Sequence, residues 1–225
     1  MNHKVSKVIW TLEEDPTAWS SWAESMAEAA ASPLMQELLE EHKTTQPGWA
    51  LDLGCGTGRA FLPLAKAGYR VIGVDPTPRC VQICRQRARQ AKISAYPLRA
   101  SAAHLPIPIK AIDFVLAISC LFHLGPLELT GAIREIYRVL LPKGTAILHF
   151  LDLEDWRRTL AEHIQPEQVP YPGYQAVVTC FCSPEKVGEW IAQAGLMLEK
   201  LELRSNVTDR GEQRNWLAYC TKLGW

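Results

Sequence analysis

The stretch ALDLGCGTGRAFLPLAKAGYRVIGVD, residues Ala50–Asp75, decides the fold of this chain. It holds an apolar run, a glycine-rich turn, a short helical segment and a second apolar run that ends in Asp75. This order is typical of a β-α-β unit, in which a helix connects two parallel strands. Such units bind dinucleotides and other adenosine-bearing ligands at the carboxyl ends of their strands. The residues around the glycines therefore indicate which ligand is held.

The spacing of these glycines differs from that of a dinucleotide site. Gly54, Gly56 and Gly58 form G-x-G-x-G, whereas a dinucleotide fingerprint is G-x-G-x-x-G with a pyrophosphate at the helix N-terminus. Asp52 precedes the first glycine by two residues, and a carboxylate there suits a cationic amine better than a phosphate. Asp75 ends the second strand, where it can accept hydrogen bonds from both ribose hydroxyls. A ligand with a ribose, a cationic amine and no phosphate is S-adenosylmethionine.

Length and composition limit the other function classes. The 225 residues suit one domain with a sizeable core, and 24 basic residues balance 24 acidic ones. This neutral balance disfavours nucleic acid as a partner, since the basic run at 85–92 falls where a solvated helix face is expected. We expect no signal peptide and no membrane span, hence a cytoplasmic protein.

The cysteines are expected to be free, reduced thiols. Their number, seven, fits reduced thiols better than a disulfide framework. Cys180-Phe-Cys182 has poor spacing for a zinc site and reads as alternating side chains on a strand. We therefore expect no metal.

Hydrophobic periodicity predicts alternating strands and helices, hence a mainly parallel sheet covered on both faces. Ser32-Pro33 is expected to divide the first helical region, and residues 205–214 read as a polar loop between two antiparallel strands. Residues 151–179 are irregular and proline-containing, and read as an insertion over the edge of the sheet. Helices are expected at 12–43, from Gly58 to Gly68, and at 78–92, 127–140 and 183–196, and strands at 50–53, 70–75, 95–101, 111–120, 145–151, 196–204 and 215–223.

Five motifs in order resemble those of class I S-adenosylmethionine-dependent methyltransferases. They are LDLGCGTGR, VIGVDPTP, AAHLPI, IDFVLAISCLFHL and EIYRVLLPKGTAIL, within residues 48–150. The resemblance implies an α/β, Rossmann-like doubly wound fold with a mostly parallel seven-stranded sheet and an antiparallel C-terminal strand. It implies an N-terminal helical cap at 1–46 and a cofactor-binding domain at 47–225, with the irregular insertion at about 151–180.

The resemblance also implies which residues hold the cofactor. Asp52 and the glycine turn would hold the methionine part, Asp75 the ribose, and Ser119 would face the sulfonium. Ser101 stands where the family often has an aspartate, so adenine binding would depend more on the N–H of Ala102. The full set is Asp52, Gly54, Cys55, Gly56, Gly58, Asp75, Pro76, Thr77, Ser101, Ala102 and Ser119.

Residues for catalysis and for the acceptor follow the fourth and fifth strands and the N-terminal helix. Methyl transfer is an in-line displacement, and a general base helps only where the nucleophile must lose a proton. His123 is the candidate base, with a structural role in its loop as the alternative. Asp152, near His149, could orient an acceptor or cap a helix. Trp19 and Trp22 could cover the site or belong to the core, and Tyr171, Tyr174 and Trp156 are further candidates for the acceptor pocket.

These observations favour a methyltransferase that acts on a small molecule, uses S-adenosylmethionine and releases S-adenosylhomocysteine. It would be a monomer or a homodimer. One alternative is a non-catalytic protein of the same fold, either a cofactor-binding module or a partner subunit. An NAD-dependent oxidoreductase is disfavoured by the glycine spacing and by the terminal hairpin. The accepting atom, whether O, N, C or S, is left open.

Overall fold

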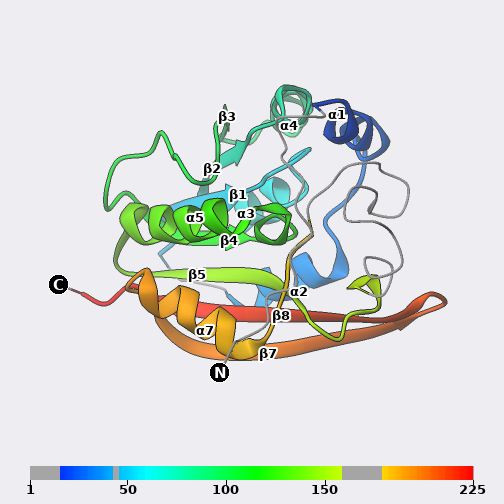
Figure 1. The fold of residues 1–225 in the computed structure, drawn as a ribbon. Coiled ribbons are helices and arrows are strands. Elements are labelled where there is room, and N and C mark those ends of the chain that lie inside the picture. Colours follow the sequence, from blue (N-terminus) through cyan, green and yellow to red (C-terminus); the bar gives the residue numbers. More distant parts are fainter. Residues whose placement is uncertain (1–15, 43–45, 159–178, 225) are drawn as a thin grey trace.

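The computed structural model describes residues 16–42, 46–158 and 179–224, which form one sheet with helices on both faces (Figure 1). The strands lie in the order β3-β2-β1-β4-β5-β8-β7, and the short β6 pairs with the end of β5. The strands are β1 (Trp49–Leu53), β2 (Arg70–Asp75), β3 (Ala95–Arg99), β4 (Ile112–Ala117), β5 (Leu140–Asp152), β6 (Phe181–Cys182), β7 (Met197–Thr208) and β8 (Gly211–Thr221). The helices are α1 (Pro16–Ser25), α2 (Pro33–Glu41), α3 (Phe61–Lys66), α4 (Pro78–Gln90), the 3₁₀ turn η1 (Leu121–His123), α5 (Pro126–Val139) and α7 (Pro184–Gln193).

The strand directions confirm the predicted fold class. Strands β1 to β5 pair in parallel, and β8 runs antiparallel to both β5 and β7. The two-residue β6 adds a short eighth strand, which contains Cys182, whereas Cys180 lies just before it. All the parallel strands end at one edge of the sheet, where the glycine turn after β1 also lies. A ligand site at this edge is the usual arrangement in open α/β sheets.

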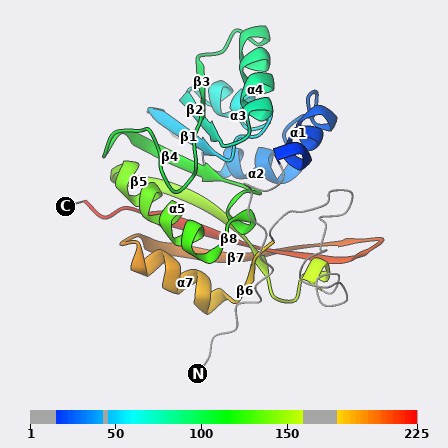
Figure 2. The ribbon, with the colours of Figure 1, turned by 45° about the horizontal axis from the view of Figure 1, so that its top comes forward.

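Helices cover both faces of the sheet (Figure 2), and each face has its own apolar cluster. Side chains of α2, α3 and α4 pack on one face, with Leu38, Phe61 and Cys84 buried there. Side chains of α5 and α7 pack on the other, with Ile133 and Trp190 buried. The helices present these residues because their apolar positions recur at three- and four-residue intervals.

The N-terminal helical region is divided as predicted. Ser32 precedes α2, and its hydroxyl accepts a hydrogen bond from the backbone N–H of Met35 at 3.2 Å. Pro33 occupies the first helical position, where its missing N–H costs nothing. Helix α1 ends earlier, at Ser25, so a linker of turns separates the two helices.

The predicted polar loop at 205–214 is wrong, because most of it is paired strand. Strands β7 and β8 continue to the pair Thr208 and Gly211, leaving only Asp209 and Arg210 in the turn. A strand that buries one face alternates apolar and polar residues, so a wholly polar segment is normally interpreted as a loop. This end of the hairpin projects beyond the rest of the sheet, so polar side chains on both faces remain compatible with pairing (Figures 1 and 2).

The strand after α5 also begins earlier than predicted. Strand β5 starts at Leu140 and includes the expected turn, with Lys143 in the left-handed region at φ 66° and a register irregularity opposite residues 112–114. Among the described helices none is both long and apolar enough to cross a membrane. In the same ranges, no cluster of three or more His, Cys, Asp or Glu side chains has a metal-binding arrangement.

Candidate active site at the carboxyl ends of the strands

The glycine turn between β1 and α3 uses glycine for two physical reasons. Gly54, Gly56 and Gly58 have φ of 68°, 52° and 84°, in the left-handed region that favours glycine. A Cβ at Gly54 would lie 2.3 Å from the Cβ of Cys120, and one at Gly58 would lie 2.7 Å from the sulfur of Cys84. Both the backbone conformation and the close neighbours therefore require these glycines.

Asp75, at the end of β2, fixes the shape of this turn. Its Oδ2 accepts a hydrogen bond from the N–H of Gly56 at 3.0 Å, and its Oδ1 accepts one from the N–H of Thr77 at 2.9 Å. Burial raises the pKa of Asp75, and these two backbone donors oppose that effect. A carboxylate has about four lone-pair positions, so Asp75 retains acceptor capacity for a ligand.

Asp52, near the end of β1, has a different environment. It is 4% exposed, and among the described residues its Oδ2 has no hydrogen-bond partner. Burial, together with the charge of Asp75, raises the pKa of Asp52 to about 7. Neither carboxylate forms an ion pair within the described part of the chain. Two neighbouring buried carboxylates without a cation favour a ligand that carries positive charge.

Helix α1 and the following linker cover the glycine turn. A Cβ at Gly56 would lie 3.0 Å from the ring of Trp22, and Trp19 packs edge-on against His123 with ring centroids 5.0 Å apart. The linker is held by Arg87, whose guanidinium donates to the carbonyls of Ala29 at 2.8 Å and Thr57 at 3.3 Å. Sequence reasoning missed this use of Arg87, because no local pattern reveals a partner 58 residues away.

The turn after β4 forms the next wall. Ser119 has φ 57°, and its backbone N–H donates to Nδ1 of His149 at 3.2 Å. His123, 7% exposed, follows in η1 and packs on Phe122 with ring centroids 4.4 Å apart. The structure therefore brings His123, Trp19 and Ser119 to the same edge as the glycine turn.

The predicted adenine-binding residues lie at the ends of β2 and β3. Thr77 is buried, whereas Pro76 is exposed and its carbonyl accepts from Arg99 at 3.3 Å. Ser101 is exposed, and its hydroxyl accepts a hydrogen bond from the N–H of Ala103 at 3.2 Å. Ala102 is half-buried beside it.

Asp152 has both carboxylate oxygens occupied by other parts of the protein. Oδ1 accepts from the N–H of Glu154 at 2.9 Å and from Nε of Arg214 at 3.1 Å, and Oδ2 accepts from the indole N–H of Trp216 at 2.5 Å. These contacts join the end of β5 to β8. Asp152 is not the cap of the following helical turn, because Asp155 directly precedes that turn and accepts from the backbone N–H of Arg157 at 2.9 Å. Trp156 lies at the same hairpin, against Gly211.

Tyr171 and Tyr174 are the remaining candidates for the acceptor pocket, and they lie outside the described residues.

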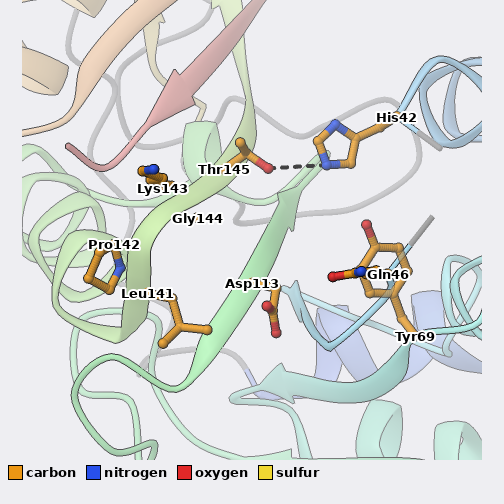
Figure 3. Close-up of a pocket in the computed structure, with 9 residues that line it drawn as sticks. All are labelled: His42, Gln46, Tyr69, Asp113, Leu141, Pro142, Lys143, Gly144 and Thr145. Carbon is orange, nitrogen blue, oxygen red and sulfur yellow. Dashed lines mark hydrogen bonds between the residues drawn. The ribbon is translucent and has the colours of Figure 1, made fainter. Parts of the chain in front are cut away.

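A separate polar cavity lies at the opposite end of the sheet (Figure 3). It has a volume of about 380 Å³ and is lined near the amino ends of β2 and β4 and by the first residues of β5. There Nε2 of His42 contacts the hydroxyl of Thr145 at 3.1 Å, and burial lowers the pKa of His42. None of the predicted site residues line this cavity, so it is distinct from the site at the glycine turn.

Comparisons with known proteins agree with the geometry. Residues 51–148 match the model of a family described as a methyltransferase domain. A demethylmenaquinone methyltransferase from Tropheryma whipplei is 33% identical over 98 residues, which are 44% of this chain and 39% of that relative. The chain thus spans less than half the length of this curated relative.

Solved structures show the same fold over a larger share of the chain. A methyltransferase from Methanosarcina mazei superposes with a TM-score of 0.71 at 18% identity, covering 87% of this chain and 100% of that one. The 1,6-didemethyltoxoflavin-N1-methyltransferase from Burkholderia thailandensis, solved with its substrate and S-adenosylhomocysteine, gives 0.67 at 16% identity, covering 92% and 84%. Residues 51–148 therefore match a methyltransferase domain, and the described chain has the fold of these S-adenosylmethionine-dependent methyltransferases.

Proposed function

We propose that this chain transfers a methyl group from S-adenosylmethionine to a small-molecule acceptor by in-line displacement. The observation that carries the proposal is the buried Oδ2 of Asp52, which has no hydrogen-bond partner among the described residues. It lies beside Asp75 and next to the turn whose glycines have positive φ. A buried carboxylate without a partner costs free energy unless a ligand compensates it. The residues present fit a cationic adenosyl ligand.

Charge distinguishes this ligand from NAD. S-adenosylmethionine has an ammonium and a sulfonium, which would offset the negative charge of Asp52 and Asp75. NAD would bring two phosphates toward the same pair of carboxylates, and like charges in a buried site repel strongly. The charge and the tighter glycine spacing both favour the adenosyl ligand.

Each part of the site has a proposed role. Asp52 and the backbone of Gly54, Cys55, Gly56 and Gly58 would hold the amino-acid end, and Asp75 the ribose hydroxyls. Pro76, Thr77, Ser101 and Ala102 would border the adenine, and Ser119 the reacting sulfur. When bound, S-adenosylmethionine supplies a methyl group on a sulfonium, and its transfer leaves the neutral thioether of S-adenosylhomocysteine.

Trp19, Trp22 and His123 are proposed to form the acceptor side. The two indoles exclude water and present aromatic faces, which attract cations. His123 would accept the proton of a hydroxyl or amine nucleophile as the acceptor atom bonds to the methyl carbon. With an acceptor that has no proton to lose, positioning of the two reactants in line would be sufficient.

A small-molecule acceptor is supported by two of the similar proteins. Demethylmenaquinone and 1,6-didemethyltoxoflavin, the compounds in their names, are both small molecules. Two arginines of α4 donate hydrogen bonds to backbone carbonyls of the same chain. Arg85 donates to Pro97, and Arg87 donates to Ala29 and Thr57. This supports the interpretation of the basic run as part of the folded protein.

The first test is calorimetric titration with S-adenosylmethionine, S-adenosylhomocysteine, NAD and 5′-methylthioadenosine, which lacks the amino-acid end. We expect micromolar binding of the adenosylmethionine pair and none of NAD. Binding of NAD instead would contradict the proposal.

Turnover separates an enzyme from the non-catalytic alternative. Methylation would be followed with demethylmenaquinone, 1,6-didemethyltoxoflavin and a panel of phenols, amines and thiols, with His123→Gln as the matched variant. Cofactor binding without turnover on any acceptor would favour the binding module or partner subunit. Turnover that is unchanged in His123→Gln would remove the general-base role and leave the transfer by positioning alone.

A further inference from the structure

His149 is buried near the carboxyl end of β5, and each of its ring nitrogens has a different partner. It is 5% exposed. Nδ1 faces the backbone N–H of Ser119 at 3.2 Å, and Nε2 lies 2.9 Å from Oδ1 of Asn215 on β8. The imidazole therefore connects the hairpin to the turn after β4.

Two partners fix the tautomer independently. A backbone N–H can only donate, so Nδ1 must be the unprotonated acceptor. On the other side, Nη2 of Arg157 also approaches Oδ1 of Asn215, at 3.3 Å. A guanidinium can only donate, which identifies that Asn215 atom as the amide oxygen and makes Nε2 the N–H donor. His149 is thus a neutral imidazole with its hydrogen on Nε2.

The charged groups around His149 preserve this state. Burial, with a smaller contribution from the charge of Arg157, lowers the pKa of His149 to about 4, against the opposing effects of the Asn215 hydrogen bond and of Asp155. Asp155 holds Arg157 by two contacts of 2.7 Å and also accepts from the N–H of Arg214 at 2.6 Å. The other neighbours of His149 are uncharged: Asn215 on β8, Ser119 in the turn after β4, and Phe122 in η1.

The Ser119 turn needs this support. Its φ of 57° lies in the left-handed region, which is unfavourable for a residue with a side chain. The next residue, Cys120, has its Cβ 2.3 Å from the position a Cβ would take at Gly54, so the two turns are in direct contact. Any relaxation of Ser119 toward a more favourable conformation would move the wall of the glycine turn.

We infer that His149 is a positioning residue whose Nδ1 holds the Ser119 peptide, and through Cys120 the glycine turn, in the conformation that binds the cofactor. This inference rests on the proposed function and assigns His149 no proton transfer. Asp155, Arg157 and Asn215 act through it, so the segment after β5 and the hairpin contribute to cofactor binding from outside the pocket.

The test compares variants at His149 that keep or remove the acceptor. In His149→Asn the side-chain oxygen can take the place of Nδ1, whereas His149→Leu keeps volume without an acceptor. We expect S-adenosylhomocysteine affinity within about threefold of the unmodified protein for the first and about tenfold or more weaker for the second. Thr145→Val is the matched control on the same strand: it loses the hydrogen bond to His42 and should leave affinity unchanged.

A pH series distinguishes positioning from a general loss of structure. Asn215→Asp places a carboxylate beside Nε2, which favours the imidazolium, and a protonated Nδ1 would oppose the Ser119 N–H. The ratio of unmodified to variant affinity should therefore increase as pH falls from 8 to 5.5. This readout remains available if His149→Leu does not fold.

The outcomes are separable. Equal affinities for His149→Asn and His149→Leu, or a ratio for Asn215→Asp that does not vary with pH, would overturn the role of His149 while cofactor binding stands. Failure of the unmodified protein to bind S-adenosylhomocysteine would overturn the proposed function, and this inference with it.

Discussion

Asp52 and Asp152 are both buried carboxylates near the carboxyl ends of parallel strands, yet their surroundings differ completely. Asp152 receives hydrogen bonds on both oxygens from Glu154, Arg214 and Trp216, whereas Oδ2 of Asp52 has no partner among the described residues. Burial alone therefore does not separate a structural carboxylate from a binding one. The number of unfilled hydrogen-bonding positions does, since folding satisfies structural groups and leaves ligand-binding groups for the ligand.

The largest effect is expected for Asp75→Ala, which removes the acceptor for Gly56 and for the ribose together. S-adenosylhomocysteine affinity should fall by about 100-fold or more, because two backbone donors and the ligand lose their partner. Calorimetry measures the affinity, and circular dichroism checks that the variant is folded. A folded variant that binds normally would contradict the role of Asp75.

Matched Asp→Asn variants at 52 and 152 should give opposite results. Asp52→Asn should weaken S-adenosylhomocysteine by about tenfold to 100-fold while increasing the stability of the ligand-free protein. Asp152→Asn should lower the free energy of unfolding by about 1–3 kcal/mol and leave affinity within about threefold. Denaturant titration and calorimetry report the two quantities, and equal behaviour of the two variants would remove the distinction drawn between them.

The pH dependence of binding should follow Asp52. Its pKa of about 7 means that a proton must leave before the carboxylate can hold an ammonium. Affinity for S-adenosylhomocysteine should fall by about tenfold between pH 8 and 6, whereas 5′-methylthioadenosine should be much less sensitive. A steep dependence retained in Asp52→Asn would assign the titration to another group.

Stability should vary with pH in two opposing ways. Asp52 is protonated more readily in the folded state, so its contribution favours folding at low pH and is lost as pH rises from about 4 to 7. His149, with a pKa of about 4, is protonated more readily when unfolded, so its contribution is lost as pH falls from about 6.5 to 4. Each is on the order of 4 kcal/mol. Unfolding of Asp52→Asn at several pH values should therefore show stability that rises with pH across this window, and a flat profile would contradict the assignment.

The smallest effects are expected at the partners of Asp152. Trp216→Phe removes a hydrogen bond to a buried oxygen and should cost about 1–2 kcal/mol of stability. Arg214→Met breaks a more exposed contact and should cost about 0–1 kcal/mol. Thermal unfolding measures both, and a change in cofactor affinity in either variant would show that Asp152 is coupled to the site after all.

Sequence patterns identified the strands, most helices and the glycine turn, because these depend on local periodicity and on glycine spacing. Ser32 and Ser183 were identified as helix starts for the same reason: a cap acts on residues three positions away. The extent of the β7–β8 hairpin was missed, because polarity on both strand faces carries no periodic signal.

The hydrogen-bond partners of the buried polar side chains could not be predicted either. Asp152 meets Trp216 across 64 positions, and His149 meets Asn215 across 66. Such contacts depend on the register of an antiparallel pair, which the sequence of neither strand specifies alone. The sequence therefore predicts only that Asp152 could orient the methyl acceptor or cap a helix, and it assigns no definite role to His149.

The two-residue turn of the long hairpin has a practical consequence. Asp209 and Arg210 are exposed, and the hairpin end projects away from the glycine turn (Figures 1 and 2). Exposed loop tips tolerate insertion better than other parts of a domain. A fluorophore or surface tether attached at this tip would allow ligand binding to be followed on the intact protein, with no reagent close to the carboxylates that distinguish the site.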